Sequence, residues 1–216
     1  MTTYVSAVNS VLRRLRETEV TSVQDNSYSK LIGDFVNDAK TIVESSYTWN
    51  ALSNTLSATT TADIFSYVLE GSGQRFRVID VLNDTTNIEM QNAATNWMDR
   101  QFLLANVQKT APVYYNFNGT DDNGDTLVDI YPIPDKAYDI RFNLIIPQTE
   151  LTADATSIKV PSEPVIFLAY AKALAERGED GGLGSNEAYA LFQKSLSDAI
   201  ALESTRYIEE SAWVPV

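Results

Sequence analysis

The residues Asp-Asp-Asn-Gly-Asp at 121–125 are the group whose types and spacing come nearest to a metal site. An EF-hand loop offers Ca²⁺ carboxylate and amide oxygens at alternate positions, with Gly at the sixth position and Glu at the twelfth. Counted from Asp121, those positions hold Thr126 and Pro132. Because both requirements fail and Asn-Gly suits tight turns, we expect a polar hairpin loop that binds no metal or other cofactor.

Four glycines between residues 178 and 184 resemble a phosphate-binding loop in composition only. A P-loop ends in Gly-Lys-Ser or Gly-Lys-Thr, and a dinucleotide-binding loop follows a strand. Here no Lys follows, a helical pattern precedes, and Glu179 and Asp180 would repel a phosphate. The glycines therefore predict a turn between two helices.

The chain contains no Cys and no His, which removes most catalytic chemistry. Cys nucleophiles, thiolate zinc sites, His general bases and His-based triads are excluded. Ser–Lys chemistry, paired carboxylates and carboxylate-bound hard metals remain. Lys172 and Lys194 lie in Ala- and Leu-rich stretches without a Ser-x-x-Lys start. We expect that the protein is not an enzyme; a hydrolase with two acids converging in a cleft is the alternative.

Length and charge narrow the class further. A chain of 216 residues can bury a core as one domain, or as one domain plus an insertion. The net charge of −13 leaves no surplus of Lys and Arg for phosphate backbones. The basic cluster Arg13, Arg14 and Arg16 ends a predicted helix, where cations complement the helix dipole. An acidic surface that DNA passes without binding is compatible with this composition.

The distribution of apolar residues predicts no membrane contact. No stretch approaches the roughly 18 to 20 apolar residues of a membrane span. The first residues, Met-Thr-Thr-Tyr, lack the basic and apolar regions of a secretory signal. We therefore expect a protein made and used in a cytoplasm, or in a particle assembled there.

Apolar residues at helical spacing predict two helices at each end of the chain. The first pair covers about 3–16 and 27–49, with Asn26 or Ser27 as the N-cap of the second helix. A polar linker at 21–27 joins the two. Because the linker is short, the two helices are expected to pack on each other.

The second pair of helices has clearer end signals. Ser162 is predicted as the N-cap of the third helix, Pro164 lies in its first turn, and Gly178 ends it. The fourth helix is expected from about 185 to 208. A tight loop joins the third and fourth helices, which again predicts that they pack together.

Between the helical ends, alternation of apolar and polar residues replaces the helical period. Turn-forming residues separate the segments and predict hairpins of 64–69 with 76–82, and of 113–117 with 126–131. The stretch 138–146 is a further strand, whereas 95–108 is ambiguous and could hold a short helix. Several strands in about a hundred residues predict a small sandwich or barrel.

The order of elements predicts an α+β fold in which the ends of the chain meet. Residues 1–49 and 161–208 are expected to form a four-helix bundle, because each apolar stripe needs a partner. Residues 50–160 are then an inserted antiparallel β domain, and 209–216 an extended C-terminal tail.

Two groups of apolar residues are candidates for partner contact. Trp213, Val214, Pro215 and Val216 end the chain with an apolar segment that Pro215 holds extended, although free termini are usually polar. Packing of Trp213 on the protein's own helices is the alternative, since large aromatics are usually well buried. In the strand-rich part, Tyr114, Tyr115 and Tyr131 are possible partner-contact aromatics, and neighbouring tyrosines on a strand place one ring on each face.

Four segments, in order along the chain, resemble the tail tubular protein A family of short-tailed phages, which are head-to-tail adaptors of the podovirus virion. They are Ser-Ala-Val-Asn-Ser-Val-Leu at 6–12, Tyr-Thr-Trp-Asn at 47–50, Val-Asp-Ile-Tyr-Pro-Ile-Pro at 128–134, and Ala-Glu-Arg-Gly-Glu-Asp-Gly-Gly at 175–182. The likeness covers nearly the whole chain. Its motifs are structural, and none is a chemical signature.

The resemblance implies a structural virion protein at the head-to-tail interface, assembled in the host cytoplasm. Members of that family form a twelve-fold ring beneath the portal, continue the DNA channel, and support the nozzle and tail fibres. The expected partners are therefore copies of the chain itself, the portal, the nozzle protein and the fibres, with DNA only in passage. The C-terminal residues would dock on the portal.

A rival interpretation is a receptor- or carbohydrate-binding virion module that uses the tyrosine-rich β domain. It predicts a monomer or trimer that binds glycan through exposed rings. The helical ends favour the adaptor, because a lectin-like module has no need of terminal helices that pair over a long separation.

Overall fold

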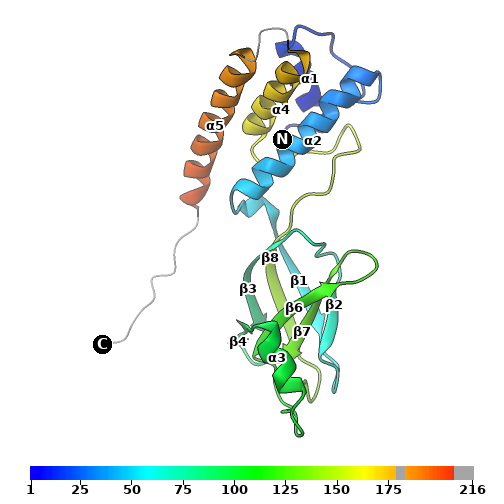
Figure 1. The fold of residues 1–216 in the computed structure, drawn as a ribbon, viewed down its shortest axis with the longest axis vertical. Coiled ribbons are helices and arrows are strands. Elements are labelled where there is room, and N and C mark those ends of the chain that lie inside the picture. Colours follow the sequence, from blue (N-terminus) through cyan, green and yellow to red (C-terminus); the bar gives the residue numbers. More distant parts are fainter. Residues whose placement is uncertain (179–182, 207–216) are drawn as a thin grey trace, which may run out of the picture. The chain divides into compact units, whose positions relative to one another are not determined.

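The computed structural model describes residues 1–178 and 183–206, and the chain divides into two compact units. The helical unit comprises Met1–Leu52 and Gln148–Val216, and the β unit comprises Ser53–Pro147. The described residues hold five α-helices and two largely antiparallel sheets (Figure 1). The predicted α+β class is thus confirmed.

Four helices belong to the helical unit: α1 (Tyr4–Arg14), α2 (Ser27–Ser46), α4 (Ser162–Arg177) and α5 (Leu183–Ser204). Helix α4 packs against the other three, and α1 and α2 also pack on each other. Their core contains the buried side chains of Val8, Val11, Ile32, Val36, Val43, Val165, Leu168 and Ala169. The four-helix bundle stays a prediction, since these pairwise contacts do not establish a closed arrangement.

The close approach of α1 and α2 depends on a glycine. A Cβ atom at Gly33 would collide with the Tyr4 hydroxyl and lie 2.7 Å from Cγ1 of Val23. Because a hydrogen replaces that methyl group, the buried Tyr4 ring can lie against the α2 backbone.

Local signals explain where the helices begin and end. Asn26 caps α2 by accepting from the Ser29 N–H at 2.7 Å, and the Ser29 hydroxyl accepts from the Asn26 N–H at 3.2 Å. Gly178 ends α4 in the left-handed conformation, with φ of 64°. The prediction of Ser162 as N-cap is wrong: Pro161 occupies that position, and the Ser162 hydroxyl instead accepts from the Thr2 hydroxyl at 2.9 Å.

A polar clamp on α2 holds the segment after the last strand. Asn37 both donates to the Leu151 carbonyl and accepts from its N–H, at 3.1 and 2.9 Å. Lys40 donates to the carbonyls of Gln148 and Thr149 at 2.6 and 3.0 Å, and lies 3.4 Å from the Glu44 carboxylate. Residues 148–151 therefore belong to the helical unit although no apolar stripe marks them.

In the β unit, the first sheet has the order β1 (Ser53–Thr59), β8 (Asp139–Ile145), β3 (Arg77–Asn83) and β4 (Ile88–Glu89). The second has the order β2 (Ser66–Leu69), β7 (Thr126–Tyr131), β6 (Tyr114–Thr120) and β5 (Gln91–Asn92). A short helix, α3 (Thr95–Phe102), precedes β6. The core between the sheets contains Leu69, Val81, Met90, Tyr115, Val128, Ile130, Tyr138, Ile140, Phe142 and Leu144.

One predicted hairpin is confirmed and the other is wrong. Strands β6 and β7 pair antiparallel, as expected. Strand β2, however, pairs with β7, whereas β3 pairs with β8 and β4 in the other sheet. The intervening turn contains Gly71 and Gly73 with φ of 79° and 59° and leads the chain between sheets. Alternation alone says which face is buried, and does not identify the strand's neighbour.

The units observed have their borders at Leu52 and at Pro147. The predicted borders, at residues 50 and 160, were those of two parts expected to fold separately. Separate folding of these parts stays a prediction.

Candidate functional site

The predicted docking residues Trp213, Val214, Pro215 and Val216 lie outside the described residues. So does the segment 209–216 that was predicted as a tail. Helix α5 and the residues that follow it, up to Arg206, are described. The surface at that end of α5 is therefore the described part of the chain nearest in sequence to the predicted docking segment.

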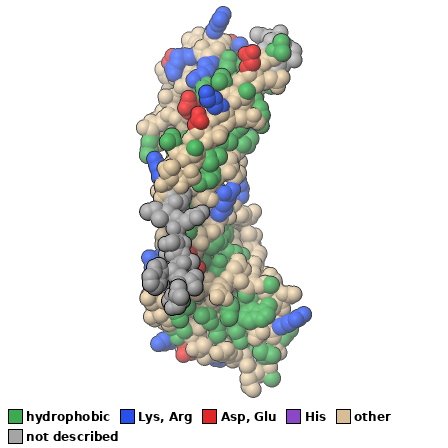
Figure 2. All heavy atoms as spheres, turned by 90° about the vertical axis from the view of Figure 1, so that its left-hand side faces the viewer, with side chains coloured by type: hydrophobic (Ala, Val, Ile, Leu, Met, Phe, Trp, Pro, Cys, Tyr) green, Lys and Arg blue, Asp and Glu red, His purple; other side chains and the backbone are tan. Residues whose placement is uncertain are grey.

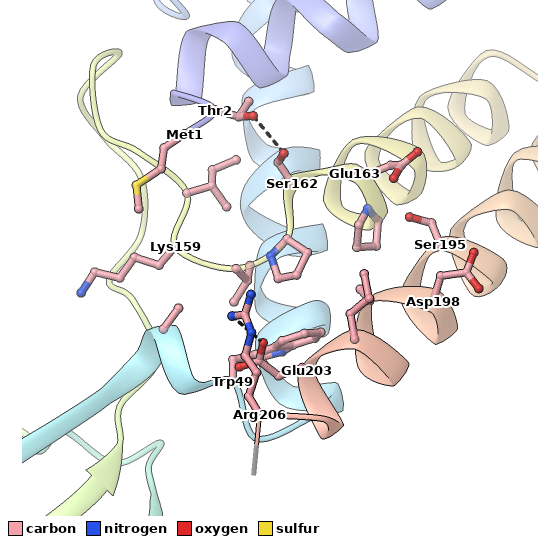
Figure 3. Close-up of a pocket in the computed structure, with 17 residues that line it drawn as sticks. Met1, Thr2, Trp49, Lys159, Ser162, Glu163, Ser195, Asp198, Glu203 and Arg206 are labelled. Atoms are coloured by element: carbon pink, nitrogen blue, oxygen red, sulfur yellow. Dashed lines mark hydrogen bonds and ion pairs between the residues drawn. The ribbon is translucent and has the colours of Figure 1, made fainter.

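A cleft of about 620 Å³ lies in the helical unit at this end of α5. Its walls come from the N-terminus, from 158–164 and from the α5 residues between Ser195 and Arg206. Figure 3 shows Trp49, Glu203 and Arg206 close together on one side, and Met1 and Thr2 on another. The cleft thus combines an aromatic floor with charged groups on its walls.

Glu203 is the central charged group of the cleft. It is buried, and its Oε1 atom accepts from the Asn50 N–H at 2.8 Å. Its Oε2 atom forms an ion pair with Arg206 at 3.1 Å, and the Arg206 side chain is largely exposed. The carboxylate therefore fixes the end of α5 to the start of the short 3-10 helix Asn50–Leu52.

Trp49 forms the floor and is only 1% exposed. Its indole N–H donates to the Val43 carbonyl at 2.7 Å, which satisfies a carbonyl near the end of α2. The Tyr47 ring meets the indole edge-to-face, with ring centroids 5.6 Å apart. The indole is thus held in place, and its only polar atom is already bonded.

The N-terminal wall is held by main-chain pairing. Thr3 and Ser157 form an isolated antiparallel bridge, and the Ile158 N–H donates to the Thr2 carbonyl at 3.0 Å. Just behind, burial raises the pKa of Tyr4 to about 12, with smaller contributions from the carboxylates of Asp34, Glu150 and Asp154. Tyr4 is therefore neutral at physiological pH and acts as a packing residue.

The outer face of α5 is a second candidate surface. Only Ala188, Phe192 and Glu203 are buried along this 22-residue helix. On the outer face, beside this buried stripe, Leu183, Leu191 and Leu202 are exposed, by 72%, 49% and 71%. A helix with apolar residues on two faces is usually covered on both, so this face is suited to contact with another protein.

Of the aromatics predicted for partner contact, Tyr114 and Tyr131 lie against Trp97 of α3, whereas Tyr115 belongs to the core between the two sheets. Tyr115 and Tyr131 are buried, and Tyr114 is half-buried. The Trp97 ring lies 4.9 Å from that of Tyr114 and 5.6 Å from that of Tyr131. The role of these tyrosines in partner contact stays a prediction, but little of Tyr115 or Tyr131 remains accessible in the single chain.

Other apolar side chains near α3 are exposed. The Phe65 and Phe102 rings lie 4.4 Å apart, and Leu103, just after α3, is 84% exposed. Ile64 and Leu104 are also exposed. Figure 2 shows hydrophobic side chains gathered over part of the β unit. Contiguous apolar surface of this kind commonly marks a site of protein contact.

The acidic loop of the sequence forms a hairpin turn. Asp121 Oδ1 accepts from the N–H groups of Asn123 and Asp125, at 2.9 and 2.8 Å. Backbone N–H groups of Gly71 and Gly73 hold the pKa of Asp125 below its usual value. Within residues 1–178 and 183–206, no three acidic side chains gather closely enough to hold a metal ion.

Sequence reasoning did not identify Glu203 or the Trp49 floor as parts of a site. The available signal was the position of Glu203 on the apolar face of a predicted helix. A glutamate at such a position needs a buried partner. Among the described residues, no helix has the length and apolar character needed to cross a membrane.

Residues 2–214 match the model of a protein family that is described as SU10 adaptor protein. The match spans both units and nearly the whole chain. No curated protein matches the sequence.

Proposed function

This chain belongs to the SU10 adaptor protein family, and we propose that it forms the head-to-tail adaptor ring of a short-tailed phage. As a family member it is a structural adaptor protein of a phage and a virion component that contacts other virion components. The ring would lie between the portal and the tail nozzle and continue the DNA channel. The family match over residues 2–214 is the observation that carries this proposal.

The ring itself is supported by the exposed outer face of α5. Copies arranged in a ring contact one another through two different surfaces, each repeated around the axis. Leu183, Leu191 and Leu202 offer one such surface without rearrangement of the helical unit. We propose a dodecamer, built in the host cytoplasm and retained in the virion tail.

The charge of the chain suits a channel for DNA. A net charge of −13 opposes binding of a phosphate backbone, so DNA can pass without being retained. The proposal includes no catalytic role, in keeping with a sequence that has neither Cys nor His. A glycan-binding module draws no support from the β unit, where Tyr115 and Tyr131 are buried.

The portal is the proposed partner of residues 213–216. The nozzle protein and the tail fibres are the proposed partners of the β unit. The exposed apolar residues Phe65, Leu103 and Leu104 supply contact surface for the latter. The cleft beside Arg206 belongs to the helical unit.

Mixing the purified chain with its portal should yield a complex with twelve copies of the 24.0 kDa chain. Native mass spectrometry of the chain alone, the portal alone and the mixture would give the stoichiometry. The variant Leu191→Asp/Leu202→Asp should prevent ring formation, because it places charges in an apolar contact. Glu187→Ala is the matched control on the same helix. A chain that binds the portal as a monomer, or a trimer that binds glycans, would refute the ring.

A chain ending at Glu210 should fold normally and lose affinity for the portal. A docked Trp is typically worth about 2 kcal/mol, which is roughly a thirtyfold change in Kd. Surface plasmon resonance on immobilised portal would measure the loss, with full-length Trp213→Ala as the matched variant. The melting temperature should stay unchanged. A drop of several degrees would instead assign Trp213 to the protein's own core.

A further inference from the structure

The two sides of the β unit are closed differently. On one side the chain from Ile88 to Asn92 passes from one sheet to the other, because β4 pairs with β3 and the next strand, β5, pairs with β6. The Met90 N–H between them donates to the Val81 carbonyl at 2.8 Å. On the other side β1 and β2 end their sheets without pairing. A groove of about 330 Å³ lies between them.

The register of β1 shows which backbone groups face this opening. All seven residues of β1 pair with β8, and the Thr60 N–H donates to the Tyr138 carbonyl in the same register. Antiparallel pairs alternate between hydrogen-bonded and non-bonded, so residues 54, 56 and 58 bond to β8. The peptide groups of Thr55, Ser57 and Thr59 therefore point to the open edge.

Two of these three residues keep free peptide groups. The Thr55 N–H is satisfied by the Asn54 side chain at 2.9 Å. Over the described part of the chain, no hydrogen bond reaches the main chain of Ser57 or Thr59 from the open side. This edge thus presents donors and acceptors at the spacing that an added strand requires.

Strand β1 also lacks the features that protect natural edges. Exposed edges usually carry charges, proline or bulges, or are very short. The sequence Ser-Asn-Thr-Leu-Ser-Ala-Thr has no charged residue and no proline, and its pairing with β8 has no register shift. The edges on the other side, β4 and β5, are two residues each. An unprotected seven-residue edge is therefore best explained by a strand that covers it.

The residues that line the groove indicate the polarity and charge of the strand that would bind there. Leu56, Ala58, Tyr67 and Leu69 line it and offer apolar contact to alternate side chains of an added strand. Glu70 is the one charged residue of its lining. An acidic segment is thus disfavoured, whereas a neutral or basic one is accepted.

A second copy of the chain is a poor occupant. Apart from β1 and β2, which border the same groove, the sheet edges are only two residues long. Pairing of copies through this groove would therefore be two-fold and would produce dimers. A structural adaptor contacts other virion components, and one of these can supply an extended segment.

We propose that the open edge of β1 binds an extended, neutral or basic segment of another virion protein, which adds to the sheet as a strand beside Ser57 and Thr59. The proposal depends on the chain's place in the virion, and is independent of ring formation and of portal docking.

The test uses the full-length chain and synthetic 15-residue peptides tiled over the other virion proteins. Fluorescence anisotropy would measure the binding of each peptide to wild type, Ser57→Ala and Ser57→Pro. Proline removes the outward N–H of Ser57 and leaves the ladder to β8 intact, because Ser57 is at a non-bonded position. Ser57→Ala keeps the N–H and removes the hydroxyl, which makes it the matched control.

At least one peptide should bind wild type and Ser57→Ala equally and lose at least about tenfold in affinity for Ser57→Pro. The same peptide should slow amide exchange at Ser57 and Thr59. If Ser57→Pro is misfolded by circular dichroism, Ser57→Lys tests the same edge with an unchanged backbone. Equal binding to the edge variant and the control, or no bound peptide, overturns the proposal. Concentration-dependent dimers that protect these two amides would identify a second copy as the occupant and would also overturn it.

Discussion

Replacing Lys40 with alanine should lower the free energy of unfolding of the helical unit by about 3–5 kcal/mol, because it leaves a buried carboxylate without its cation. The Lys40 and Glu44 side chains are only 2% and 1% exposed. Lys40 also donates to the carbonyls of Gln148 and Thr149. The variant therefore removes the ion pair and two backbone contacts together. Urea unfolding followed by far-UV circular dichroism would measure the loss.

The double variant Lys40→Met/Glu44→Leu distinguishes an ionic effect from a packing effect. It removes both charges and keeps most of the side-chain volume, so it should be more stable than Lys40→Ala. Lys30→Ala, at an exposed position of the same helix, should change stability by less than about 0.5 kcal/mol. If Lys40→Ala behaves like Lys30→Ala, the clamp on residues 148–151 contributes little to stability.

The helices of this protein are predictable because their signals are local. The stripes of α1 and α2, the cap at Asn26 and the left-handed Gly178 all lie within a few residues of the features they determine. The end of α2 shows the limit of such signals. Tyr47 is extended, with φ of −150°, so the helix stops at Ser46 and Trp49 turns back to bond Val43.

The β unit is less predictable because its pairing is not local. Strand β1 has only Leu56 and Ala58 as apolar residues, and a Ser- and Thr-rich sequence gives a weak pattern. Its partner, β8, follows it by some eighty residues. Likewise β2 and β3 are neighbours in sequence but belong to different sheets. The five strands predicted from alternation correspond to β2, β3, β6, β7 and β8, whereas β1, β4 and β5 and the order of the strands could not be anticipated.

Neither the polar clamp on α2 nor the candidate cleft could be predicted from the sequence, for a related reason. Lys40 and Glu44 have the i,i+4 spacing that is common for exposed ion pairs on helix surfaces, so their sequence does not indicate burial. Their burial follows from contact with residues 148–151, more than a hundred positions away. Glu203 is similar, because its partner Asn50 lies at the other end of the chain.

Replacing Trp49 with alanine should also cost about 3–5 kcal/mol of unfolding free energy, since a buried tryptophan leaves a large cavity when it is truncated. The loss includes the hydrogen bond from the indole N–H to the Val43 carbonyl. The cleft between the N-terminus and α5 would lose its floor. We therefore expect faster amide exchange at Asn50, whose N–H is held by Glu203 on the other side.

Trp49→Phe separates the two contributions. Phenylalanine keeps much of the buried ring and lacks the indole donor, so it should lose about 1–3 kcal/mol, the usual effect of leaving a buried carbonyl unsatisfied. Asn50 should remain protected in this variant, because the floor still packs against the end of α5. Calorimetry and hydrogen exchange on the two variants would test this ordering. Equal stability of Trp49→Ala and wild type would show that the indole does not hold α2, the 3-10 helix and α5 together, and the cleft would then not be a preformed surface.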